Sequence, residues 1–332
     1  MHRIMRILAI IASLVGYFVL LMGSLVTTTG SGQGCGNSWP FCHGQIIPGT
    51  ITVAGVIEYS HRVVSSVDGL LVLVLAIGAW LLYNDFRARL FGILSLFFVV
   101  LQGALGALTV VYEGTFVKTW LLSVHFGLSL IAFASALLLT IRLFQIDRGQ
   151  RDGAGWSEGN RRMSVERLQY PIWGLAIYTY IVVYTGALVE HAGALMGCGY
   201  EVPGCGSTYF PNLTSTAGIQ VLHRYAASSL WILVLALLIV VTRRYSEQRD
   251  IVRGSWWAFI LITLQAISGA AQVLTGGQMI AILSHTTIIS VFFAVLCYLC
   301  MQVGWPWRRK QTQQNENERQ LEPAASAREP AL

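Results

Sequence analysis

Eight long apolar blocks run through the sequence, and they constrain its fold more than any other feature. Each approaches or exceeds the roughly 20 residues that an α-helix needs to cross a bilayer. Backbone groups in a bilayer must be hydrogen-bonded within the protein, so helices are the expected form. The sequence therefore predicts an all-α integral membrane protein with eight transmembrane helices. We expect these spans at about 7–28, 55–83, 90–112, 119–143, 171–193, 217–242, 255–275 and 279–303.

Composition agrees with an integral membrane protein and argues against a soluble or a nucleic-acid-binding protein. Charged residues make up 11% of the chain, whereas a soluble domain carries about 25%. The first block is too long for a secretory signal peptide, and no small-residue cleavage site follows it. The net charge of +6 does not indicate nucleic-acid binding, because no basic groove or stripe is present.

Basic residues are concentrated in alternate connections between the apolar blocks. One set of segments is rich in arginine and comprises MHRIMR, NDFRARL, 144–169, RRYSEQRDIVR and WRRK. The connections of the other set, at 29–54, 113–118, 194–216 and 276–278, contain a single basic residue, Lys118. Connections rich in Lys and Arg stay on the cytoplasmic side of a membrane. We therefore expect both termini of the chain to be cytoplasmic.

The two halves of the chain resemble each other at an offset of about 162 residues. Such self-similarity indicates duplication, here into two tandem, parallel-repeat four-helix bundles. The bundles are expected at 1–145 and 170–305, joined by a cytoplasmic linker at 146–169 and followed by a polar, disordered cytoplasmic tail at 306–332. The matched positions are Cys35 and Cys198, Cys42 and Cys205, His61-Arg62 and His223-Arg224, Gly106 and Gly269, and His125 and His285.

Four histidines lie within predicted spans, namely His61, His125, His223 and His285. A histidine in hydrocarbon is costly and is functional by default, although a single one could simply hydrogen-bond a neighbouring carbonyl. All four are expected about 9 Å below the outer end of their helix, with one pair in each bundle. Such pairs suit two axial ligands on either side of haem. Copper and zinc also take nitrogen ligands, but no Cys, Met or carboxylate set completes such a site.

Glu58 lies three residues before His61, so both side chains share one helix face. Gln220 has the same spacing to His223. The two side chains have nearly the same shape, but only the carboxyl group can carry a charge or take up a proton. This asymmetry suggests that one haem site performs chemistry and the other supports it. An interfacial carboxylate in contact with water is the alternative.

Arg62 and Arg224 directly follow two of these histidines. A cation near the membrane surface could pair with haem propionates, and interfacial snorkelling is the competing interpretation.

Cysteines recur at a spacing of seven in the two large outer loops. The outside of the cell is oxidising, so we expect the disulfides Cys35–Cys42 and Cys198–Cys205. Whether the first pair is structural or redox-active stays open. Cys297 and Cys300 are expected to be packed as small apolar side chains.

Over all eight spans the chain resembles the haem A synthase family, membrane enzymes that convert haem O to haem A for cytochrome oxidases. The resemblance rests on the duplicated bundle, the Glu58-x-x-His61 pair, the other three histidines and the paired cysteines. It implies oxidation of the C8 methyl of haem O to a formyl group through an alcohol. One departure is GALVEHAGALMG near the end of the fifth span, where Glu190 and His191 have no assigned role.

The resemblance also implies a division of labour between the two halves. It assigns His61 and His125 to the iron of the substrate haem O, His223 and His285 to the iron of a haem b cofactor, Glu58 to catalysis, and Cys35 and Cys42 to the vicinity of the substrate.

Two other functions would also use paired histidines in helical bundles. One is a di-haem b-type cytochrome for quinol electron transfer, and the other is a haem transporter or chaperone. The expected location is a bacterial plasma membrane, with haem sites near the outer face. A haem O-forming farnesyltransferase is the expected partner, whereas the electron acceptor and any homo-oligomer stay open.

Overall fold

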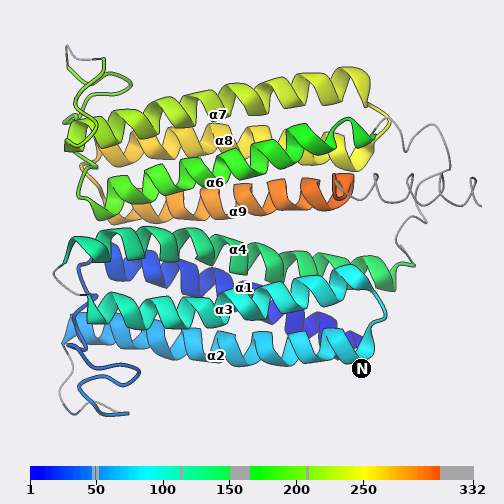
Figure 1. Ribbon diagram of the computed structural model, residues 1–332, viewed down its shortest axis with the longest axis horizontal. Coiled ribbons are helices and arrows are strands. Elements are labelled where there is room, and N and C mark those ends of the chain that lie inside the picture. The colour runs from blue at the N-terminus through cyan, green and yellow to red at the C-terminus, as the bar shows by residue number, and fades with distance from the viewer. Residues whose placement is uncertain (47–48, 50–51, 113–114, 150–164, 207–208, 307–332) are drawn as a thin grey trace, which may run out of the picture.

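The computed structural model describes residues 1–306 except for 47–48, 50–51, 113–114, 150–164 and 207–208. Most of the predicted linker and nearly all of the predicted tail therefore lie outside the described residues. The described part is helical, and its helices run side by side along the length of the molecule (Figure 1).

Eight helices of the described residues are long and apolar enough to cross a membrane, which confirms the predicted spans. Several extend beyond the predicted bounds, because a helix continues into the interface after its apolar stretch ends. They are α1 (His2–Thr28), α2 (Val53–Leu82), α3 (Phe86–Val111), α4 (Phe116–Asp147), α6 (Gln169–His191), α7 (Thr216–Arg244), α8 (Arg249–Leu274) and α9 (Met279–Val303).

The contacts between helices divide them into two groups of four. In the first group α1 contacts α2, α2 contacts α3, α3 contacts α4, and α4 returns to α1. The helices α6, α7, α8 and α9 contact one another in the same cyclic order. The result is that α2 lies across its group from α4, and α7 lies across its group from α9. The groups meet where α4 contacts α6 and α9, and where α1 contacts α9 (Figure 1).

Small residues allow the helices to approach one another closely. Ala9, Ala12, Ala79 and Ala88 are fully buried in the first group. A Cβ added at Gly92 would lie 3.3 Å from the backbone of α2. Close contact of this kind is how membrane helices associate, since lipid provides little hydrophobic drive between them.

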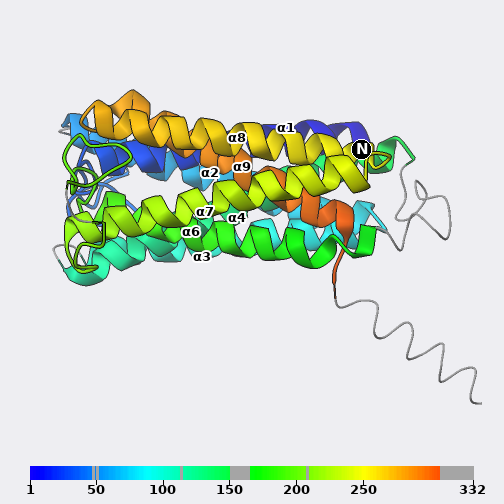
Figure 2. The same cartoon turned by 90° about the horizontal axis from the view of Figure 1, so that it is seen from above.

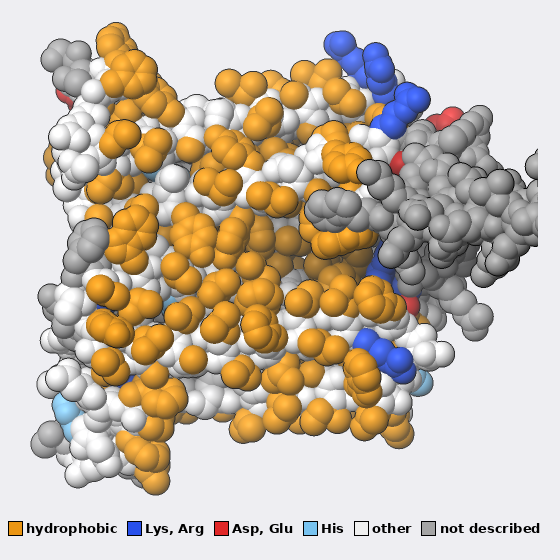
Figure 3. Space-filling model, viewed as in Figure 1, with side chains coloured by type: hydrophobic (Ala, Val, Ile, Leu, Met, Phe, Trp, Pro, Cys, Tyr) orange, Lys and Arg blue, Asp and Glu red, His pale blue; other side chains and the backbone are white. Residues whose placement is uncertain are grey.

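Large apolar side chains point away from the helix groups, including Leu70, Trp80, Phe97 and Ile232. Figure 3 shows them as a broad hydrophobic band along the helices, with the Lys and Arg side chains of that face at one end. A surface of this kind fits the acyl chains of a bilayer.

The two ends of the molecule differ in chemistry. One end, which we call the disulfide end, holds the loops with Cys35–Cys42 and Cys198–Cys205, both of which are formed as predicted. These loops gather at the same end in both views (Figures 1 and 2). The opposite end, which we call the arginine end, contains Arg3, Arg6, Arg87, Arg89, Arg243, Arg244, Arg249 and Arg253.

Candidate haem sites

The four histidines occupy equivalent positions near the disulfide end. They lie on α2, α4, α7 and α9, each within the first three turns of its helix. The Nδ1 or Nε2 atoms of such rings are the usual protein ligands of haem iron.

A glycine of the preceding helix lies against each imidazole ring. An added Cβ would crowd the ring at Gly186 and Gly269 of the second group, whereas at Gly23 and Gly106 of the first group it would make an ordinary van der Waals contact. That Cβ would be 3.4 Å from Cε1 of His61 at Gly23, 3.8 Å from Cε1 of His125 at Gly106, 2.9 Å from Cε1 of His223 at Gly186, and 3.2 Å from Cε1 of His285 at Gly269.

Each helix group contains one pair of these histidines. His61 and His125 are close enough for one ring to act electrostatically on the other, and the same holds for His223 and His285. Each pair comes from two helices that lie across their group from each other. Within the described residues, no three His, Cys, Asp or Glu side chains cluster as metal ligands. Two imidazoles per group fit a haem, whose iron takes histidine ligands, better than a tetrahedral metal site, which needs four ligands.

Glu58 is held beneath the first disulfide loop. Its side chain is 5% exposed, one carboxylate oxygen accepts the backbone N–H of Cys35 at 2.9 Å, and the other pairs with Arg62. In the second group Gln220 takes the same place, and its Oε1 accepts the backbone N–H of Cys198 at 2.7 Å. In both halves a side chain accepts the backbone N–H of a loop cysteine. That side chain is a carboxylate in the first half and an amide in the second.

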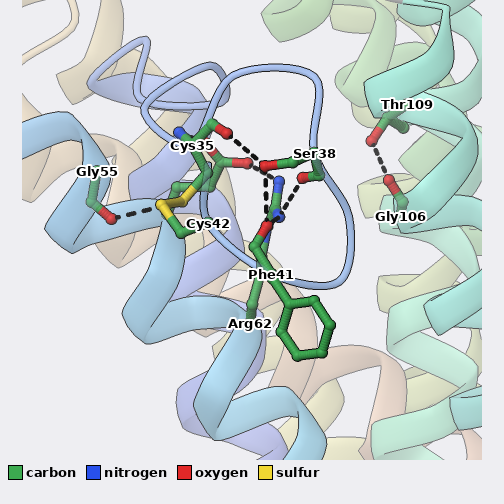
Figure 4. A network of polar contacts seen from close by, with 9 residues as sticks. Cys35, Ser38, Phe41, Cys42, Gly55, Arg62, Gly106 and Thr109 are labelled. Carbon is green, nitrogen blue, oxygen red and sulfur yellow. Dashed lines mark hydrogen bonds and ion pairs between the residues drawn. A yellow bond between two sulfur atoms is a disulfide. The ribbon is translucent and has the colours of Figure 1, made fainter. Parts of the chain in front are cut away.

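Arg62 connects α2 to the first disulfide loop. Its Nη1 donates to the carbonyl oxygens of Ser38 at 2.7 Å and Phe41 at 3.0 Å. Figure 4 shows the guanidinium reaching into this loop. These contacts give the arginine a structural role, and its predicted pairing with a haem propionate stays a prediction.

Arg224 makes the equivalent contacts in the second half, to the carbonyl oxygens of Pro203 at 3.1 Å and Gly204. Its Nη2 is buried without a hydrogen-bond partner among the described residues, because Gln220 stands where the first half has a carboxylate.

The Nδ1 atoms of the histidines differ between the two groups. In the second group the Nδ1 of His223 lies 2.9 Å from Oγ1 of Thr185, and the Nδ1 of His285 lies 2.9 Å from Oγ of Ser268. Across the described part of the first group, the buried Nδ1 atoms of His61 and His125 have no hydrogen-bond partner. Thr185 and Ser268 were not predicted from the sequence as site residues, although each directly precedes one of the glycines that lie against the imidazole rings.

Glu190 and His191 end α6 at the disulfide end. Each has a buried polar atom without a partner in the described part of the chain. His191 is close enough to act electrostatically on His125 of the other group. His191, which has no role assigned from the sequence, is therefore near His125 of the first pair.

Comparison with known proteins identifies the family. A sequence model of the COX15-CtaA family, described as cytochrome oxidase assembly protein, matches residues 6–297. The chain is 41% identical over 302 residues to a heme A synthase of Bacillus mycoides strain KBAB4, covering 91% of this chain and 94% of that protein. Heme A synthases of Bacillus cereus strains G9842 and 03BB102 are each 40% identical over the same share of both chains. The chain therefore belongs to the COX15-CtaA family of cytochrome oxidase assembly proteins.

Proposed function

We propose that this chain is a haem A synthase, an oxidoreductase that converts the C8 methyl of haem O to the formyl group of haem A. The observation that carries the proposal is the carboxylate of Glu58, which is present in only one of the two histidine sites, where the other site has Gln220. The relatives named heme A synthase support the same reaction over most of the chain.

The two helix groups are duplicated, parallel bundles with different tasks. Matched contacts of Cys35 with Glu58 and of Cys198 with Gln220 support the duplication. His61 and His125 bind the iron of the substrate haem O, and His223 and His285 bind the iron of a b-type haem. When bound, that second haem supplies one-electron redox chemistry.

The reaction takes its oxygen from water and requires an external electron acceptor. Each of two oxidations removes two electrons and one proton from the substituent carbon, and water adds to the cation while losing its own proton. The first round gives the alcohol, and the second gives a geminal diol that loses water to become the formyl group. In total four electrons and four protons leave the substrate and water.

Glu58 performs two tasks in this scheme. Its negative charge stabilises the cation that develops beside the porphyrin ring, and its oxygen accepts the proton of the attacking water. The N–H of Cys35 and the guanidinium of Arg62 hold the carboxylate in one position. The first disulfide loop thereby fixes the base and covers the substrate site.

The haem sites lie near the outer face of a bacterial plasma membrane, with both termini in the cytoplasm. The disulfides support this orientation, because they lie at the same end as the histidines and form in an oxidising compartment. Haem O must be delivered to the enzyme, so a haem O-forming farnesyltransferase is its natural partner.

The test combines purification with the mass of the extracted haems. We expect haem b together with haem O, the alcohol or haem A in the wild-type protein. Haem b alone would favour the di-haem cytochrome, and exchangeable haem without oxidised product would favour the transporter.

The Glu58→Gln variant copies the arrangement of Gln220, so we expect it to retain haem and to lower haem A formation about 100-fold or more. Glu201→Gln makes the same replacement in the exposed second loop and serves as the control. A normal rate of haem A formation by Glu58→Gln would refute the catalytic role of this carboxylate.

A further inference from the structure

Two hydroxyl groups connect the second pair of histidines to the backbone of the preceding helices. Oγ1 of Thr185 lies 2.9 Å from Nδ1 of His223 and 2.7 Å from the carbonyl oxygen of Val182. Oγ of Ser268 lies 2.9 Å from Nδ1 of His285 and 2.9 Å from the carbonyl oxygen of Gln265. Two different helices thus build the same three-atom arrangement.

This arrangement selects one tautomer of each ring. A hydroxyl group has a single hydrogen, and a carbonyl oxygen can only accept. The hydroxyl therefore donates to the carbonyl and accepts the N–H of the imidazole at Nδ1. The Nε2 atom of the neutral ring then carries the free lone pair, which is the form that binds iron.

The first pair of histidines lacks these hydroxyl groups. The residues that precede Gly23 and Gly106 are Met22 and Leu105, where the second half has Thr185 and Ser268. Neither side chain can accept an N–H from Nδ1 as a hydroxyl does, and the buried Nδ1 atoms have no partner within the described residues. Within the part of the chain that the structure describes, no hydrogen bond to Nδ1 therefore fixes the orientation of these two rings.

We infer that Thr185 and Ser268 are positioning residues that retain the b-type haem, and that their absence from the first site lets substrate and product haem exchange. The inference rests on the proposed function, in which one haem stays and the other must leave. A hydrogen bond to the second ring nitrogen orients a ligand histidine and raises its basicity, and its loss typically lowers metal affinity 10- to 100-fold.

The first measurement is the rate at which haem leaves the purified full-length protein for an excess of apomyoglobin. The protein is produced in a host that makes no haem O, so that only b-type haem is present. Thr185→Val and Ser268→Ala remove the hydroxyl groups and should release haem about tenfold faster or more. Thr185→Ser keeps the hydroxyl and should retain haem as the wild type does.

The second measurement is the midpoint potential of the bound haem, which reports on the electron density that the ligand rings donate to the iron. A ligand ring without its Nδ1 hydrogen bond donates less electron density, so the potential should rise in both hydroxyl-free variants. Thr179→Val is the matched control on α6, because Thr179 is buried and its hydroxyl donates to the carbonyl of Leu175 at 2.8 Å.

The inference would be overturned if Thr185→Val and Ser268→Ala lost haem at the same rate as Thr179→Val and had the same midpoint potential. That result would leave the proposed function intact. A wild-type protein that binds haem nowhere would instead overturn the proposed function itself, and the inference with it.

Discussion

At the scale of single residues, the contact between imidazole and glycine sets how closely the helices carrying the histidines approach their neighbours. The contact is tightest at Gly186 and loosest at Gly106, judged by the space that a Cβ would find beside the ring. A methyl group at the tightest position must displace either the ring or the helix. Close packing in protein interiors transmits such a shift to the ligand position.

We expect Gly186→Ala to weaken haem binding at the second site, because the new Cβ would lie 2.9 Å from Cε1 of His223. Overpacking of this kind costs about 1–3 kcal/mol, which corresponds to roughly a 5- to 150-fold loss in affinity if it falls on the bound state. The absorbance of the low-spin b-type haem measures the effect.

Gly174→Ala on the same helix is the control, since an added Cβ there meets nothing within 4 Å. Equal haem content in the two alanine variants would show that the ring has room to move aside.

The sequence predicted the ligand candidates at this scale but not the residues that hold them. An ionisable residue inside an apolar block is conspicuous, so the four histidines and Glu58 could be selected from the sequence. Thr185 and Ser268 could not, because a hydroxyl in an apolar helix usually bonds its own backbone, as Thr179 does. Only the position of the neighbouring helix reveals that they also contact a histidine.

At the scale of elements, a buried ion pair joins the turn between α2 and α3 to α4. Arg142 is 3% exposed, and its Nη2 and Nε lie 2.5 Å and 3.1 Å from the carboxylate oxygens of Asp85. The same carboxylate accepts the N–H of Ala88 at 2.8 Å and so caps the start of α3. One carboxylate therefore joins the start of α3 to α4 at the arginine end.

Asp85 should make stability depend on pH. Burial alone would raise the pKa of Asp85, but the hydrogen bonds from Arg142 and Ala88 and the charge of Arg142 outweigh it and hold that pKa below 3.8. A carboxyl group with a lowered folded pKa stabilises the fold above its unfolded value. The contribution is therefore complete above about pH 4 and is lost as the pH falls through the lower folded pKa of Asp85.

We expect Asp85→Asn to lower the free energy of unfolding by about 3 kcal/mol, because it removes the carboxylate that pairs with the buried guanidinium of Arg142. Asparagine caps helices nearly as well as aspartate, so this variant isolates the ion pair. Thermal unfolding followed with a thiol-reactive dye measures the effect, since Cys297 and Cys300 are free and lie inside the protein.

The matched control is Asp147→Asn, which breaks the more exposed pair of Asp147 with Arg6 and should cost less than about 1 kcal/mol. A loss of similar size in both variants would contradict a special role of the buried pair. The advantage of the wild type over Asp85→Asn should also shrink as the pH falls below about 4.

At the scale of the whole molecule, the two helix groups meet along α1, α4, α6 and α9. Hydroxyl pairs help to join them, with Tyr17 bonded to Thr287 at 2.9 Å and Ser24 to Thr286 at 3.2 Å. Eight spans and their order follow from apolar length, which the sequence states directly. The sequence does not reveal which helices of one group contact the other group. Lipid and protein interior both favour apolar residues, and the packing of small polar side chains decides which helices pair.

The orientation of the molecule in the membrane is the last prediction, and it follows from the contrast between the two ends. Arginines are concentrated at one end and the disulfides at the other, and each observation separately predicts that the arginine end faces the cytoplasm. Alkaline phosphatase becomes active only after export, so we expect it to be inactive when fused after residue 332 and active when inserted in the loop near residue 200. Green fluorescent protein should give the opposite pattern. Fluorescence from an insertion near residue 200 would mean that the orientation is the reverse of the predicted one. Glu58 and all four histidines would then lie next to the reducing cytoplasm, where neither disulfide loop could be maintained over the substrate site.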